Sequence, residues 1–158
     1  MKFKDYKYVR PDFNAVAGRL EALAKKIEAS LVLEEIEACI DELFKIQNEY
    51  ETMTTLAMIR STIDTNDEFY SKELEVIQEE SNIVTSKETL LYKVLVEHKL
   101  RSELEKKYGS YWFKSMEISL KCYDDSVSDL LVAESKLTTE YDRVMASAQI
   151  EFNGKINN

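Results

Sequence analysis

The sequence predicts an all-α fold: five to six mostly long antiparallel helices in a bundle, with the start of a β-hairpin at the C-terminus. Only three glycines and one proline occur in 158 residues, too few for the tight turns of a sandwich, a barrel or an open sheet. Apolar residues instead recur at steps of three and four, the spacing of an amphipathic helix. With 44% hydrophobic and 32% charged residues, the chain can bury a core as one domain.

This single domain, residues 1–158, divides into an extended arm (1–10), a helical bundle (11–148) and an incomplete hairpin (149–158). The arm is predicted because aromatic and charged residues alternate between Phe3 and Tyr8. Such an alternating segment is expected to lie against another surface.

Two helices are expected after the arm. Pro11 suits the first turn of a helix, whose apolar stripe runs from Phe13 to Ile27. A second stripe begins at Leu33, with acidic residues mostly outside it, and predicts a helix that reaches Ile63.

The third helix is predicted to begin at Thr65-Asn-Asp-Glu68, which has the form of a capping box. Its apolar stripe extends to Leu95. The polar pairs Ser81-Asn82 and Thr85-Ser86 lower helical propensity midway and favour a bend or break near Ser81.

A short helix follows, because Ser102 with Glu105 fits another cap and Gly109 suits a helix end. The segment 111–120, which contains the only tryptophan, begins the next apolar face.

Residues 124–126, two aspartates and a serine, offer a cap for a last helix whose stripe reaches Ala148. After it, Asn153-Gly154 is the preferred pair for a type I′ turn and predicts the start of a hairpin. The count is therefore five or six helices and one unfinished hairpin.

The charge distribution excludes two classes of partner. The formal net charge is −9, and no basic stripe of the kind that binds nucleic acid or anionic membranes occurs after the arm. No apolar run is long enough to span a bilayer, and no secretory signal follows the N-terminal lysines. We therefore expect a cytoplasmic protein with solvated acidic faces.

Catalytic metal chemistry is not expected within the chain. Zinc helices place two histidines at i and i+4, and di-iron bundles need two Glu-x-x-His pairs. The sequence has one histidine, His98, and Ser102 stands at i+4. A surface or helix-end role for His98 is the better interpretation.

Nucleophilic chemistry is similarly weak. Cys39 lies on the apolar side of the second predicted helix, and both Cys39 and Cys122 are interpreted as buried thiols, with a disulfide as the alternative. No glycine-rich phosphate loop occurs. The nine tyrosines, six phenylalanines and one tryptophan favour core packing, with a peptide groove as the alternative. Expected exceptions to burial lie near element ends: Tyr6, Tyr8, Tyr70 and Tyr111.

Three segments resemble the N-terminal region of the oligoendopeptidase F branch of the thimet-like zinc oligopeptidases, over nearly the whole chain. The first is the aromatic arm running into Tyr8-Val-Arg-Pro-Asp12. The second is Thr55-Leu-Ala-Met-Ile-Arg-Ser-Thr-Ile-Asp-Thr-Asn-Asp-Glu-Phe-Tyr70. The third combines Lys136-Leu-Thr-Thr-Glu-Tyr with Ala146-Ser-Ala-Gln-Ile-Glu-Phe-Asn-Gly-Lys155.

The resemblance implies a non-catalytic N-terminal lobe of a zinc metallo-oligoendopeptidase. Such enzymes resemble a clam of two helical lobes around a deep channel, with the HExxH zinc helix several hundred residues further on. No catalytic, cofactor or metal residue carries over to this chain, so the chain itself is expected to be inactive and zinc is implied only for the full-length parent. The implied partners are the catalytic lobe and, in the parent, short peptides.

Four residues are candidates for the inter-lobe or channel surface, because they cluster at the junction of two long helices: Arg60, Asp64, Asp67 and Tyr70. Local capping and helix-end charge are the alternative role. For the whole chain, the alternative function is a free-standing acidic helical interaction module, with self-association through exposed apolar faces.

Overall fold

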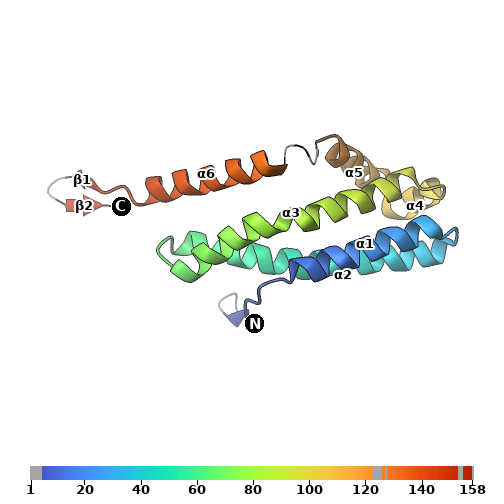
Figure 1. Ribbon diagram of the computed structural model, residues 1–158, viewed down its shortest axis with the longest axis horizontal. Helices are drawn as coiled ribbons and strands as arrows, with labels where there is room; N and C mark the ends of the chain where they lie inside the picture. The colour runs from blue at the N-terminus through green and yellow to red at the C-terminus, as the bar shows by residue number, and fades with distance from the viewer. Residues whose placement is uncertain (1–4, 123–125, 127, 153–154, 158) are drawn as a thin grey trace.

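The computed structural model describes residues 5–122, 126, 128–152 and 155–157, and shows an all-helical body (Figure 1). The predicted all-α fold is confirmed. Along these residues lie the helices α1 (Phe13–Ala29), α2 (Leu33–Ile63), α3 (Glu68–Glu97), α4 (Arg101–Tyr108), α5 (Ser110–Cys122) and α6 (Ser128–Ala146), then the strands β1 (Ile150–Phe152) and β2 (Lys155–Asn157).

The long helices α1, α2 and α3 lie side by side and reverse direction at each connection (Figure 1). Their apolar stripes meet in one core, to which α4 and α5 add Leu104, Phe113 and Met116. On α1 the buried stripe includes Ala17 and Ala24, each 2% exposed. Alanines at these positions let the backbones approach closely, so α1 packs tightly against α3.

Helix α1 begins later along the chain than predicted. Asp12 is the N-cap and its carboxylate accepts a hydrogen bond from the Ala15 N–H at 2.9 Å. Pro11 therefore precedes the cap instead of lying in the first turn. The aspartate satisfies an amide that has no partner within the helix, which fixes where the helix begins.

The start of α3 also differs. Asp67, and not Thr65, is the N-cap: its carboxylate accepts from the N–H groups of Phe69 and Tyr70 at 2.9 and 3.2 Å. The turn before it is closed by the Asp67 N–H, which donates to the Asp64 carbonyl. The turn thus places the aspartate at the cap position.

The sequence favoured a bend or a break near Ser81, and the break is wrong, because α3 is continuous from Glu68 to Glu97. The hydroxyl of Thr85 donates to the Ser81 carbonyl at 3.2 Å, so this polar side chain is satisfied inside the helix. Burial of Val84 in the core outweighs the low local propensity.

The two shorter helices are joined at Gly109, whose φ of 88° ends α4 as expected. Ser102 is not a cap, since α4 begins at Arg101 with Leu100 as its N-cap. Arg101 links α4 to α5 through Nη2, which lies 2.7 Å from the Glu117 carboxylate.

His98 is the C-cap of α3, in agreement with the expected helix-end role. Its Nδ1 accepts from the Leu100 N–H at 3.1 Å, so Nε2 carries the proton and donates to the Ser30 carbonyl, also at 3.1 Å. The ring therefore ties the α1–α2 connection to the α3–α4 connection.

Helix α6 lies alongside α3, and after it β1 and β2 pair antiparallel with Ile150 opposite Asn157 and Phe152 opposite Lys155 (Figure 1). The expected turn at Asn153-Gly154 lies outside the described residues, so the type I′ hairpin stays a prediction. The same holds for most of the expected cap at 124–126, of which only Ser126 is described. Among the described residues, no helix has the length and apolar character needed to cross a bilayer.

Candidate functional site

The described part of the N-terminal arm, residues 5–10, runs across the ends of α2 and α3 and is fixed there by Glu73. This carboxylate is 4% exposed. It accepts from the Tyr8 hydroxyl at 2.7 Å and from Arg10 Nε at 2.9 Å, and Arg10 Nη2 completes a two-pronged ion pair. The buried charge is thus fully paired by two residues of the arm.

The electrostatics of this contact favour an ionised Glu73. The Arg10 hydrogen bonds lower the pKa of Glu73, against an opposing effect of burial, and the Tyr8 hydroxyl lowers it further. Burial and the neighbouring carboxylate raise the pKa of Tyr8, which therefore stays protonated as a donor. Near neutral pH, Glu73 therefore stays ionised and Tyr8 stays protonated. This contact has a structural role, since neither group exchanges a proton in that range.

Two of the four predicted site residues are brought together at this end of the molecule. Arg60, near the end of α2, donates to the Tyr70 hydroxyl on α3 and to the Tyr6 carbonyl in the arm. Its guanidinium carbon also lies 5.4 Å from the centroid of the Tyr70 ring. Arg60 thus joins both helices to the arm.

Asp64 and Asp67 take part in hydrogen bonds within the turn and at the start of α3. Asp67 caps α3, and the Asp64 carboxylate accepts from the Asn66 N–H at 3.0 Å in the connecting turn. The alternative of local capping therefore describes both aspartates. Both carboxylates thus bind backbone N–H groups between the end of α2 and the first turn of α3.

A shallow hollow of about 680 Å³ opens where the arm meets this junction. Two rings of its lining are in edge-to-face contact, with the Tyr8 and Tyr70 centroids 5.8 Å apart. Phe69 packs on both and is still 55% exposed. The hollow is lined by Asp5, Tyr6, Lys7, Tyr8, Arg60, Ile63, Phe69 and Tyr70. Aromatic rings beside cationic groups form a surface suited to peptide side chains and carboxylates.

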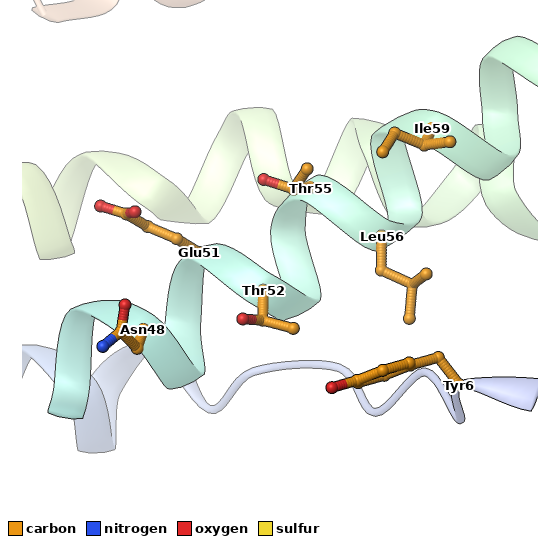
Figure 2. Close-up of a pocket in the computed structure, with 7 residues that line it drawn as sticks. All are labelled: Tyr6, Asn48, Glu51, Thr52, Thr55, Leu56 and Ile59. Carbon is orange, nitrogen blue, oxygen red and sulfur yellow. The ribbon is translucent and has the colours of Figure 1, made fainter. Parts of the chain in front are cut away.

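A second hollow, of about 390 Å³, lies between the arm and α2. Figure 2 shows the Tyr6 ring below Leu56, with Thr52 beside it and Glu51 further along the same helix. The arm is anchored near here, since the Val9 N–H points to the sulfur of Met53 at 3.4 Å. Tyr6 therefore lines both this hollow and the larger one.

Sequence reasoning missed Glu73, the residue that holds the arm. A signal was present: Glu73 follows Phe69 by one helical turn and precedes Ile77 by another, so a carboxylate stands on the apolar stripe. An acidic residue at a core position predicts a buried cationic partner. Which cation would pair with it could not be read from the spacing.

The histidine and the two cysteines have the following surroundings in the described part of the chain. No group of three or more His, Cys, Asp or Glu side chains there could hold a metal ion. Both nitrogens of His98 bond to the backbone. Both cysteines are free, Cys39 buried and Cys122 exposed, so the expectation of a second buried thiol is wrong at Cys122.

Solved structures place this fold among peptidases. One, described as PZ peptidase A with an inhibitor, matches with a TM-score of 0.94 and 34% identity. A second, assigned to oligoendopeptidase F, matches at 0.94 and 32%. A third, assigned to oligoendopeptidase F from Bacillus anthracis str. Ames, matches at 0.93 and 35%. Each covers 99% of this chain, and the chain spans 28–29% of theirs, less than a third of their length.

These matches define the class: an N-terminal helical region of a peptidase. The description "Peptidase M3 N-terminal domain" belongs to a family profile that matches residues 3–123. The chain therefore belongs to the Peptidase M3 N-terminal domain family, in its oligoendopeptidase F branch. No curated protein matches the sequence.

Proposed function

We propose that this chain is the non-catalytic N-terminal lobe of a zinc metallo-oligoendopeptidase that hydrolyses short peptides. The lobe walls one side of a substrate channel, so that short unfolded peptides reach the metal and folded proteins are kept out. The observation that carries the proposal is the match over 99% of the chain to peptidase structures at 32–35% identity. A cytoplasmic location stays a prediction.

The zinc belongs to the other lobe in this proposal. When bound there, zinc polarises a carbonyl and activates water. The described residues of this chain do not fit it, because His98 is held by two backbone groups and no ligand cluster accompanies it. The contribution of this lobe is therefore shape and surface chemistry.

We assign the peptide-facing surface to the hollow at the arm. Arg60 and Tyr70 line it, with Lys7 and the exposed Phe69 ring beside them. A passing peptide would find cationic groups for its carboxylates and rings for its apolar side chains. Asp64 and Asp67 act in this proposal by fixing the turn that carries Tyr70.

A chimera tests the proposal. The matched N-terminal segment of the Bacillus anthracis protein is replaced by this chain, and hydrolysis of a short fluorogenic peptide is measured. The chimera is expected to cleave the peptide, and the 158-residue chain alone is expected to be inert. Substituting Phe69→Ala in the chimera should raise KM more than it lowers kcat, since the residue contributes binding surface.

The control is Leu31→Ala at the α1–α2 connection, where the apolar residue is 64% exposed against 55% for Phe69; this variant should leave KM unchanged. A folded chimera without activity would contradict the lobe and favour the free-standing acidic interaction module. Peptide hydrolysis with stoichiometric zinc by the isolated chain would also overturn the proposal.

A further inference from the structure

Helix α6 contacts the rest of the molecule through a side that is polar except for Val132. Its half-buried residues are Val132, Ser135 and Thr139, which share one face. The Thr139 hydroxyl accepts from Gln78 of α3 at 2.7 Å, and Lys136 Nζ lies 2.6 Å from the Glu79 carboxylate.

This contact with α3 is thin. A hollow of about 480 Å³ remains where α6 passes the α2–α3 junction, and the Arg143–Glu75 pair beside it is 3.6 Å apart and half exposed. The Gln78 side-chain oxygen is enclosed without a hydrogen-bond partner among the described residues. Packing against α3 therefore stabilises α6 little.

The apolar side of α6 points the opposite way. At 3.6 residues per turn, the positions 130, 137, 141 and 144 lie on the face opposite 132, 135 and 139. These residues are exposed to 69% (Leu130), 66% (Leu137), 63% (Tyr141) and 61% (Val144). Figure 1 shows α6 at the edge of the molecule with α3 on one side. An amphipathic helix normally buries its apolar stripe, so this face is built to be covered by another protein surface.

The comparisons indicate what covers it. The family profile ends at residue 123, before α6 begins at Ser128, whereas the peptidase structures match 99% of the chain and therefore include α6. In those peptidases α6 thus lies beyond the N-terminal domain, in chains more than three times as long as this one. The side of α6 that includes Ser135 and Thr139 packs on the N-terminal domain. The remaining part of the longer peptidase chain can then pack on the apolar side.

We propose that the outward apolar face of α6, formed by Leu130, Leu137, Tyr141 and Val144, is the surface on which the catalytic lobe of the parent peptidase packs. The inference rests on the proposed function and identifies the surface through which this lobe contacts the catalytic lobe. A second copy of this chain is a poorer occupant, because each copy carries a net charge of −9.

The test compares the accessibility of one position in two contexts. Cys122→Ser removes the exposed thiol, Cys39 is buried, and Leu137→Cys then supplies a single reporter for maleimide labelling. In the 158-residue chain this thiol should react as an exposed cysteine. In the chimera with the Bacillus anthracis protein its labelling rate should fall at least tenfold. The matched control is Leu31→Cys, because Leu31 is 64% exposed and Leu137 is 66% exposed. The thiol at position 31 should react equally fast in the isolated chain and in the chimera.

Equal labelling of Leu137→Cys in the folded chimera and the isolated chain would overturn the proposal. If the chimera protects this thiol but does not cleave the peptide, the result supports the proposed packing surface on α6 and contradicts the proposed function. If the chimera does not fold, the two cysteines are placed at the aligned positions of the intact Bacillus anthracis protein, and the same comparison decides.

Sedimentation of the 158-residue chain tests the second copy as occupant. We expect a monomer, and Leu137→Asp should lower the unfolding free energy by less than about 1 kcal/mol, because Leu137 is 66% exposed in the chain itself. A dimer that Leu137→Asp converts to a monomer would assign the face to a second copy and overturn the proposal, as would a large loss of stability in this variant.

Discussion

At the residue scale, Glu73 shows how one buried charge can hold a segment that has no helical structure. A carboxylate removed from water carries a large desolvation cost unless its oxygens are bonded. Arg10 and Tyr8 satisfy both oxygens from a distance of 63 and 65 positions along the chain. The contact therefore attaches the arm to α3. It also holds in place the rings of Tyr6 and Tyr8, which line the 680 Å³ hollow.

Replacing this charge should destabilise the protein in a pH-dependent way. Glu73→Gln is expected to cost about 1–3 kcal/mol of unfolding free energy at pH 7, because it removes charge-assisted hydrogen bonds in a buried setting. Since the folded-state pKa of Glu73 is lowered, its ionisation stabilises the protein above the unfolded carboxyl pKa of about 4.3. That contribution is lost as the pH falls through the folded-state pKa.

Urea unfolding of both proteins between pH 7 and pH 2 measures this effect. The difference between wild type and Glu73→Gln should shrink toward the acid end, where Glu73 becomes neutral. Arg19→Gln is the control: its pairs with Glu42 and Glu49 are exposed, so its cost should stay within about 1 kcal/mol. A pH-independent difference for Glu73→Gln would contradict the ion-pair account.

At the element scale, the helices show where local propensity decides and where packing does. The two N-caps that the described residues show with a side-chain hydrogen bond are aspartates, Asp12 and Asp67, one or two positions beyond the predicted starts. The end of α2 at Ile63 was predicted from its stripe alone. The continuity of α3 was not predicted from the sequence. Burial of Val84 and Leu91 outweighs the low helix propensity of the residues between Ser81 and Ser86.

Two glycines should respond oppositely to alanine. Gly109→Ala is expected to lower stability by about 1–2 kcal/mol, because its φ of 88° strains any residue with a Cβ. Gly18→Ala, within α1, should raise stability by about 0.5–1 kcal/mol, since alanine restricts the unfolded chain. Neither added Cβ would meet an atom within 4 Å, so the backbone alone sets both signs.

Thermal or urea unfolding of the two variants measures the difference. Gly109→Asn serves as an internal control: the ψ of 144° at this position lies outside the left-handed helical region that asparagine tolerates, so this variant should lose about as much stability as the alanine variant. Equal effects of alanine at both glycines would show that helix packing, and not the local φ, governs the α4–α5 junction.

At the scale of the whole molecule, the two cysteines report on folding from opposite environments. Cys39 belongs to the core at 2% exposure, and burial raises its pKa, which lowers the fraction of reactive thiolate. Cys122, at the end of α5, is exposed. We expect one thiol to react with a chromogenic disulfide reagent in the native protein and two in urea. Two fast native thiols would contradict a closed core, and Cys122→Ser should abolish the native reaction.

The sequence by itself determined the helical class, a count of five or six helices with their approximate bounds, and the resemblance to a peptidase lobe. These follow from spacing and local chemistry, because a period of three and four residues encodes a helix without reference to its neighbours. It also placed Arg60 and Tyr70 at one junction, since they flank a single turn.

Only the tertiary structure decided which surfaces meet. The pairing of Glu73 with Arg10 joins residues 63 positions apart, and the outward direction of the α6 stripe depends on which side of that helix docks on α3. Periodicity shows that a helix has an apolar face but not where the face points. That choice depends on the competition among all surfaces for burial, which is a property of the folded chain.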